Sequence, residues 1–213
     1  NTLRYNYSKK IDITANLNFQ QSFFKFNDFS TNIFLLNPSL FLNIKKTGFG
    51  NFSLSYSENN TLPEVNQLTL NFQLTDYRNF SQGTAYNKPL KNQTTTLNYY
   101  IYNDEKRFSI NTSVYYVNSK SIFNTSSNLT SDFNFNSYIQ TKGSNSYNFN
   151  FSFVNYVRKL KLASKIETNN SWITSPINVN STEFLNAKSY SNSIKYSGTT
   201  YFKSKINFDF GFS

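Results

Sequence analysis

The chain has 213 residues, of which 19% are aromatic and 15% charged, and it contains no cysteine, methionine or histidine. These absences exclude disulfides and thiolate metal sites, and they remove the base of serine–histidine and cysteine–histidine catalysis. We therefore expect no enzyme, no cofactor and no metal centre. Lysine and arginine number 21 against 11 acidic residues, which gives a net charge of +10.

A basic, aromatic-rich chain suits either single-stranded nucleic acid or an anionic membrane surface. The positive charges are spread along the sequence in short doublets such as Lys9-Lys10 and Arg158-Lys159. A nucleic-acid domain more often carries a denser basic stripe. The pattern therefore favours a membrane surface, and we expect no nucleic-acid partner.

The sequence contains no candidate transmembrane helix, because its longest apolar run is Ile33-Phe34-Leu35-Leu36 and such a helix needs about 18 residues or more. It opens on Asn1 without an apolar leader or an initiator methionine. We expect a processed mature protein or a piece of a longer one, with residues 1–213 forming a single domain.

Apolar and polar residues alternate with period two in most of the chain, which is the pattern of half-exposed β-strands. In chain order, clear alternation covers residues 11–19, 40–44, 52–56, 95–101, 108–116, 147–153, 160–166 and 202–212, and weaker alternation covers 3–7 and 190–196. This predicts an all-β protein of about ten antiparallel strands. Most are long enough for the 9 to 11 residues that a tilted strand needs to cross a bilayer.

The predicted connections alternate between short and long. Short ones fall at residues 8–10, 46–50, 103–107, 157–159 and 197–200, and long ones at 27–38, 58–91, 118–145 and 168–186. Up-and-down barrels of the outer membrane have short periplasmic turns and long external loops. We therefore predict an up-and-down transmembrane β-barrel, part of a larger barrel, in the outer membrane of a Gram-negative bacterium.

In such a barrel one parity of each strand faces lipid and the other faces the lumen. The residues expected to face lipid are Leu97, Tyr99, Ile101, Ile110, Val114, Phe149, Phe151, Phe153, Leu160, Leu162, Phe208 and Phe210. The residues expected to face the lumen are Lys161, Lys165, Lys203 and Lys205. Tyr7, Tyr56, Tyr102 and Phe108 lie near predicted strand ends, where an aromatic girdle is expected.

The long connections are the expected place for ligand or partner contacts. The candidate contact residues are Tyr77, Arg78, Tyr86, Lys88 and Trp172. Trp172 has a second interpretation, in which it packs on its own loop. The acidic residues Glu58, Glu64 and Asp76 are expected to be solvated loop charges.

One part of the sequence resembles a known family. Leu62-Pro63-Glu64-Val65-Asn66-Gln67-Leu68 is followed by Gly83, then by Asn87-Lys88-Pro89-Leu90-Lys91, a strand ending in Tyr99-Tyr100-Ile101-Tyr102, and a strand reaching Tyr115-Tyr116. In this order the segment resembles the C-terminal barrel region of TonB-dependent-receptor-like outer-membrane proteins of the Bacteroidota type. In this chain Lys88 separates the asparagine from the proline.

This resemblance implies a receptor or transporter barrel that takes up or binds an extracellular ligand through long surface loops. The implied partners are outer-membrane lipid and lipopolysaccharide, and a surface lipoprotein or other subunits of an outer-membrane complex. TonB is a partner only if a plug and a TonB box lie upstream. The alternatives are a non-transporting subunit of a larger complex, a small complete pore and a secreted soluble β adhesin.

Overall fold

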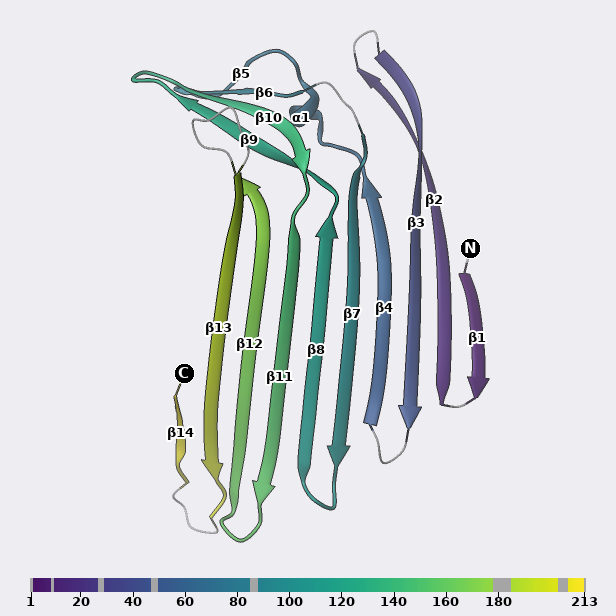
Figure 1. Cartoon of the computed structure of the whole chain (residues 1–213), viewed down its shortest axis with the longest axis vertical. Helices are drawn as coiled ribbons and strands as arrows, with labels where there is room; N and C mark the ends of the chain where they lie inside the picture. Colours follow the sequence, from purple (N-terminus) through teal and green to yellow (C-terminus); the bar gives the residue numbers. More distant parts are fainter. Residues whose placement is uncertain are drawn as a thin grey trace.

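The computed structural model describes residues 2–8, 10–26, 29–46, 50–84, 88–177, 185–202 and 207–212. These residues form an almost entirely β-structure, which confirms the predicted all-β class. Ten antiparallel strands make one large sheet, in the spatial order in which they follow along the chain (Figure 1). They are β1 (Thr2–Ser8), β2 (Ile11–Phe26), β3 (Phe29–Lys46), β4 (Gly50–Thr61), β7 (Leu90–Asn103), β8 (Phe108–Ser119), β11 (Asn145–Val157), β12 (Leu162–Ile177), β13 (Leu185–Thr200) and β14 (Asp209–Phe212).

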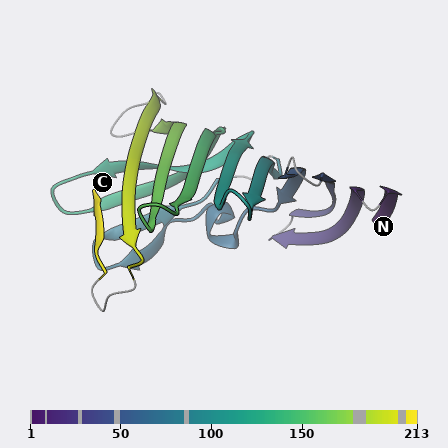
Figure 2. The same ribbon diagram turned by 90° about the horizontal axis from the view of Figure 1, so that it is seen from below.

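A second sheet of four strands is built from two insertions between strands of the large sheet. One insertion carries the helix α1 (Val65–Leu68) and the strands β5 (Gln73–Asp76) and β6 (Asn79–Gln82), and the other is the hairpin of β9 (Ser121–Leu129) and β10 (Asn134–Lys142). Strand β10 joins them by pairing in parallel with β6. The second sheet lies across one end of the large sheet (Figures 1 and 2).

The large sheet is open, because its order begins at β1 and ends at β14 and no pairing joins these two strands within the described residues. The two strands lie on opposite sides of the molecule in both views (Figures 1 and 2). The predicted antiparallel up-and-down order is therefore present, but these ten strands do not close into a barrel.

The two faces of the large sheet differ sharply in chemistry. Residues paired across antiparallel strands lie on the same face, so the registers group Leu54, Leu97, Val114 and Phe149 in one row. We call this the apolar face. The neighbouring row on the other side holds Ser53, Asn98, Ser113 and Asn150, and we call it the polar face. The parity that was read from each strand separately is thus continuous from β4 to β11, whereas the same row holds Asn170 in β12 and Asn192 in β13.

Two strands of the large sheet contain a proline, and each proline lies where a ladder ends. Pro38 is inside β3, one residue before the β3–β4 ladder begins at Ser39. Because proline has no backbone N–H, Pro38 cannot donate a hydrogen bond to β4. Beyond Pro38, Asn60 connects β4 to β3 instead. Its backbone N–H donates to Asn37 Oδ1 at 2.7 Å, and its Nδ2 donates to the Leu36 carbonyl at 2.6 Å.

Two of the long connections predicted from the sequence are wrong. Strands β2 and β3 pair along their whole length up to Phe26 and Phe29, so most of residues 27–38 are strand. Strand β12 continues to Ile177 and β13 begins at Leu185, so the described part of the predicted loop at 168–186 is strand. The polar run from Thr168 to Ser171 suggested a loop, but pairing with β11 and β13 on both sides holds it in strand.

The other two long connections fold into the second sheet instead of forming open loops. This sheet has its own small core, in which the Phe80 and Phe135 rings stack at 5.2 Å and Phe72 meets Phe135 edge-on at 5.7 Å. Leu68 of α1 is buried beneath it. No helix in the described part of the chain has the length and hydropathy needed to cross a membrane.

Candidate lipid-facing and ligand-facing surfaces

The apolar face is not covered by any other part of the described chain. Apart from prolines, the aliphatic and aromatic side chains that are buried among the described residues are Leu35 and Leu68. Large side chains of the apolar face remain open, including Tyr190 at 58%, Ile194 at 57% and Phe212 at 70% exposure. A sheet of this length normally buries one face against a second layer. This face is therefore the principal unpartnered surface of the molecule.

An aromatic row crosses the apolar face close to the second sheet. The row consists of Tyr56, Tyr116, Tyr147, Trp172 and Tyr190, which the registers align on neighbouring strands with Thr95 in one position. The Tyr116 and Tyr147 rings stack at 4.5 Å, and the Trp172 and Tyr190 rings lie 5.1 Å apart. Rows of this kind combine an apolar body with a polar tip, which suits the boundary between hydrocarbon and water.

The expected girdle residues fall into three groups. Tyr56 belongs to the aromatic row, and Phe108 lies on the apolar face at the opposite end of the sheet, paired with Asn103 and Asn155. Tyr102 lies on the polar face, where its hydroxyl donates to Asp104 Oδ1 at 3.1 Å. The side chain of Tyr7 lies outside the described part of the structure.

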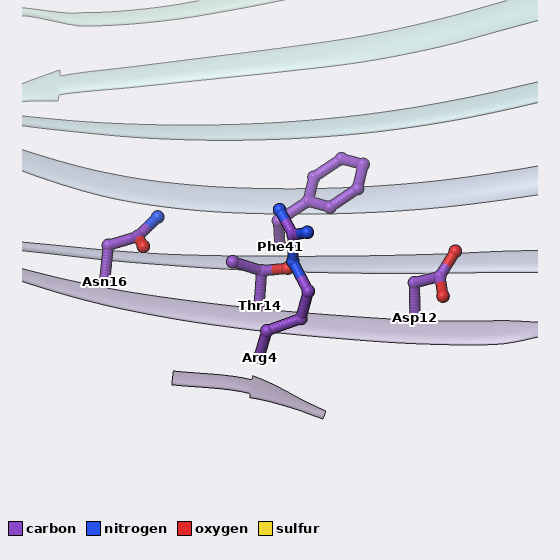
Figure 3. Close-up of a pocket in the computed structure, with 5 residues that line it drawn as sticks. All are labelled: Arg4, Asp12, Thr14, Asn16 and Phe41. Atoms are coloured by element: carbon purple, nitrogen blue, oxygen red, sulfur yellow. The ribbon is translucent and has the colours of Figure 1, made fainter. Parts of the chain in front are cut away.

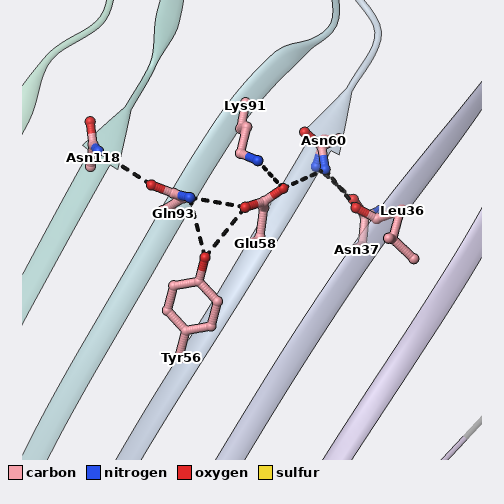
Figure 4. Close-up of polar contacts among 8 residues, drawn as sticks. All are labelled: Leu36, Asn37, Tyr56, Glu58, Asn60, Lys91, Gln93 and Asn118. Carbon is pink, nitrogen blue, oxygen red and sulfur yellow. Dashed lines mark hydrogen bonds and ion pairs between the residues drawn. The ribbon is translucent and has the colours of Figure 1, made fainter.

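Beyond the aromatic row, the apolar face ends in a polar network centred on Glu58 (Figure 4). The Glu58 carboxylate forms an ion pair with Lys91 and accepts hydrogen bonds from Gln93 Nε2 at 2.9 Å and from the Tyr56 hydroxyl at 3.3 Å. Asn118 Nδ2 extends the network by donating to Gln93 Oε1 at 3.3 Å. These contacts join β4, β7 and β8 just where the second sheet begins.

This network corrects the expectation that Glu58 is a solvated loop charge. Glu58 lies inside β4, and its side chain is 12% exposed. A carboxylate at this depth must be paired and hydrogen-bonded, and both conditions are met. The sequence carried one signal of this placement. Glu58 is two residues beyond Tyr56, so the two side chains share a face if the strand continues to Glu58.

The predicted contact residues Tyr77 and Arg78 form the turn between β5 and β6. The Arg78 guanidinium lies 4.9 Å from the centre of the Tyr77 ring, and Tyr77 is 77% exposed. The Arg78 carbonyl accepts a hydrogen bond from the Asn134 N–H at 2.9 Å, which ties the turn to the β9–β10 hairpin. The turn is thus an exposed aromatic and cationic pair on a fixed backbone.

Asp76 holds this turn together through its carboxylate, which accepts from the N–H groups of Arg78 and Asn79, both at 3.1 Å, and from Asn79 Nδ2 at 2.6 Å. The hydrogen bond from the Arg78 backbone, followed by that from the Asn79 side chain, lowers the pKa of Asp76. Hydrogen bonds that the ionised Asp76 carboxylate accepts stabilise the ionised form and so lower the pKa.

We expect the turn to loosen in acid. Because the folded pKa of Asp76 is below its unfolded value, the stabilisation is present above the unfolded pKa and is lost as pH falls through the folded pKa. The protection factors of the Arg78 and Asn79 amides against hydrogen exchange should therefore fall in that window. Asp76→Asn is the control, and its exchange should lack this acid dependence. An identical pH profile in both proteins would contradict the assignment.

The polar face carries two hollows. The larger, of about 480 Å³, is lined by Arg4, Asp12, Thr14, Asn16 and Phe41. In Figure 3 the Arg4 side chain extends from β1 across β2 towards Phe41. The smaller, of about 170 Å³, lies over β8, β11 and β12 and is lined mainly by asparagine and serine side chains. Both are open, hydrophilic surfaces suited to water or a polar solute.

The remaining predicted residues are distributed as follows. Lys165 lies on the polar face and pairs with Glu167 at 2.8 Å. Nine residues of the predicted lipid-facing set lie on the apolar face: Leu97, Tyr99, Ile101, Ile110, Val114, Phe149, Phe151, Phe153 and Leu162. Phe210 of β14 also lies there, against Gly198.

Several predicted positions are not strand residues. Leu160 and Lys161 lie in the turn between β11 and β12, where Lys161 has a positive φ of 47°. Phe208 precedes β14, and its carbonyl accepts from the Thr200 N–H at 3.0 Å. Tyr86, Lys203 and Lys205 lie outside the described residues. In the described part, no group of three His, Cys, Asp or Glu side chains is placed to hold a metal ion.

Trp172 is not a loop residue. It lies within β12, on the apolar face, between Tyr147 and Tyr190. Its two proposed roles, ligand contact from a loop and packing on its own loop, both assumed an irregular backbone that the strand pairing rules out.

The segment that carries the family resemblance is brought together at the second sheet. The Thr84 N–H donates to the Gln67 carbonyl at 2.9 Å, and the Gly83 N–H donates to the Thr69 carbonyl at 2.6 Å. Comparison with models of known protein families gives no match, and comparison with curated protein sequences gives none either. The resemblance to TonB-dependent receptors therefore stays a prediction from the residues.

Proposed function

We propose that the ten-stranded sheet is part of the wall of an outer-membrane β-barrel, with its apolar face against lipid and its polar face towards the lumen. The observation that carries this proposal is the uncovered apolar face, whose central row is apolar from β4 to β11 and whose aromatic row extends to β13, opposite a row of serine and asparagine side chains. In lipid, strands must have every backbone group paired within the protein. Strands β7, β8 and β11 meet this condition along nearly their whole length, whereas β13 pairs with β14 only from Tyr196 to Thr199.

Strand length and the aromatic row favour lipid over a second protein layer as the occupant of the apolar face. The central strands are 12 to 16 residues long, which exceeds the 9 to 11 residues that a tilted strand needs to cross a bilayer. The aromatic row and the polar network follow each other at one end of this face. That succession matches the change from hydrocarbon to headgroup to water.

The second sheet supplies the proposed ligand-facing part. It stands at the end of the large sheet that carries the long connections, and it presents the Tyr77–Arg78 pair on a braced backbone. We assign to the protein the uptake or binding of an extracellular ligand at this end, as in TonB-dependent-receptor-like barrels. Lipopolysaccharide and outer-membrane lipid are the proposed surroundings of the apolar face, and a surface lipoprotein is a proposed partner.

The unpaired edges at β1 and β14 also support a second candidate, a wall segment in a larger, non-transporting outer-membrane complex. In both candidates further strands, from the same protein or from a partner, complete the barrel. The open sheet argues against a small pore made of these ten strands alone, and the uncovered apolar face argues against a soluble adhesin.

The proposed orientation is tested with single cysteines, because residues 1–213 contain none. Tyr77→Cys, in the second sheet, should react with a membrane-impermeant maleimide on intact cells. Lys106→Cys, in the short turn between β7 and β8 at the other end, should react only after the outer membrane is permeabilised. The unsubstituted protein controls for background labelling. Equal labelling of both positions on intact cells would contradict a membrane-spanning wall.

A further inference from the structure

A cavity of about 420 Å³ lies where the second sheet meets the ends of β7 and β8. Four lysines line it, and they come from separate segments of the chain. Lys88 precedes β7, Lys91 is in β7, Lys120 links β8 to β9, and Lys142 ends β10. Residues that are up to 54 positions apart in sequence therefore line one cavity.

Three of these lysines are not neutralised by an acid. Lys91 is paired with Glu58, whereas no ion pair joins Lys88, Lys120 or Lys142 to a carboxylate within the described residues. All three side chains are exposed. Like charges that share a cavity repel one another unless an anion is bound between them. The cavity therefore has an excess of positive charge and no internal counterion.

The backbone around the cavity is fixed by hydrogen bonds that do not use the lysine ammonium groups. The Lys120 N–H donates to the Lys91 carbonyl at 2.8 Å, and the Lys120 carbonyl accepts from the Gly143 N–H at 3.1 Å. Gln140 Nε2 donates to the Lys88 carbonyl at 3.0 Å. These bonds fix the backbone positions of the three lysines relative to one another, which lowers the ordering cost of binding a ligand.

We propose that this cavity binds a phosphate-bearing group through Lys88, Lys120 and Lys142. A phosphate carries more than one negative charge and several acceptor oxygens, and lysine ammonium groups bind it as point charges. The cavity volume lies within the usual range for small-molecule sites, about 300–1,000 Å³. The phosphate belongs either to a soluble ligand or to a lipid headgroup. The headgroup source alone rests on the proposed membrane placement.

The test uses the intact protein, purified in detergent, and inorganic pyrophosphate titrated by calorimetry. The variant K88Q/K120Q/K142Q should weaken pyrophosphate binding by about tenfold or more, because all three charged contacts to the anion are lost. The matched control K45Q/K106Q/K159Q removes three exposed lysines at the opposite end of the sheet. It has the same net charge and should retain the binding.

The charge-preserving variant K88R/K120R/K142R shows whether substitution at these three positions disturbs the fold. It should retain most of the affinity for pyrophosphate. To identify the source, native mass spectrometry compares the uptake of phosphatidic acid and phosphatidylcholine by the same proteins. Preferential, lysine-dependent binding of phosphatidic acid assigns the site to a headgroup. Lysine-dependent binding of pyrophosphate without phosphatidic acid assigns it to a soluble ligand. The pyrophosphate arm requires no bilayer, so it stands even if the membrane placement fails.

Two results would overturn the proposal. One is the absence of lysine-dependent binding to either probe. The other is an equal loss in the two glutamine variants, which would mean that net charge alone attracts the anion.

Discussion

Leu97→Lys is expected to lower the free energy of unfolding of the protein in a bilayer by about 2–4 kcal/mol, the cost of a charge on the lipid face near the midplane. Leu97 lies in the middle of β7 on the apolar face, between Leu54 and Val114. In the proposed barrel the Leu97 side chain contacts the hydrocarbon of the bilayer. A lysine there must either lose its hydration or distort the bilayer around it.

The matched control is the next residue along the same strand. Asn98 lies on the polar face between Ser53 and Ser113 and donates a long hydrogen bond from its Nδ2 to Ser53 Oγ at 3.4 Å. Asn98→Lys should therefore lower the free energy of unfolding by about 1 kcal/mol or less, the net worth of one hydrogen bond. Urea unfolding of both variants in lipid vesicles measures the difference. If the two lysines cost the same, the apolar face does not contact lipid.

Gly143→Ala is expected to detach the β9–β10 hairpin from the end of the large sheet. A Cβ at Gly143 would clash with the Ser119 carbonyl oxygen and would stand 2.7 Å from the Lys120 carbonyl carbon. Both obstacles are backbone atoms, so no side-chain rotation relieves the clash. Overpacking of this kind costs typically about 1–3 kcal/mol, and we expect the cost to appear as local opening of the hairpin.

Limited proteolysis measures this opening. The Gly143→Ala protein should be cleaved faster in the β9–β10 turn, near Ser131 and Asp132, while the large sheet stays resistant. Ser144→Ala is the control, because it keeps the backbone hydrogen bond from the Ser119 N–H to the Ser144 carbonyl. If the Gly143→Ala protein is cleaved at an unchanged rate, the hairpin is not held by the close approach of Gly143 to Ser119 and Lys120.

The alternation of apolar and polar residues in each strand is a local property, and the sequence was sufficient to identify it. Tyr147, Phe149, Phe151 and Phe153 occupy one face of β11 as their spacing predicts. Side chains alternate across any strand whatever lies beside it. The all-β class and the antiparallel order follow from the same pattern together with the turns between strands.

Strand ends and loops required the tertiary structure. Residues 168–171 are polar and predicted a loop, yet two neighbouring strands hold them in β12 and bring Trp172 into the aromatic row. The connections at 58–91 and 118–145 contain short strands whose partners lie far away in sequence, such as β6 with β10. Strand propensity depends on the neighbours that a segment finds, and these cannot be read from the segment alone.

The sequence by itself determined which residues share a face of each strand, and with that the contrast between the apolar and polar faces. The tertiary structure alone decided which distant residues meet. Glu58 and Lys91 form an ion pair, and Lys88, Lys120 and Lys142 share a cavity. The reason is physical: side-chain alternation is set by each residue's own backbone, whereas register and sheet order are set by hydrogen bonds between strands remote in the chain.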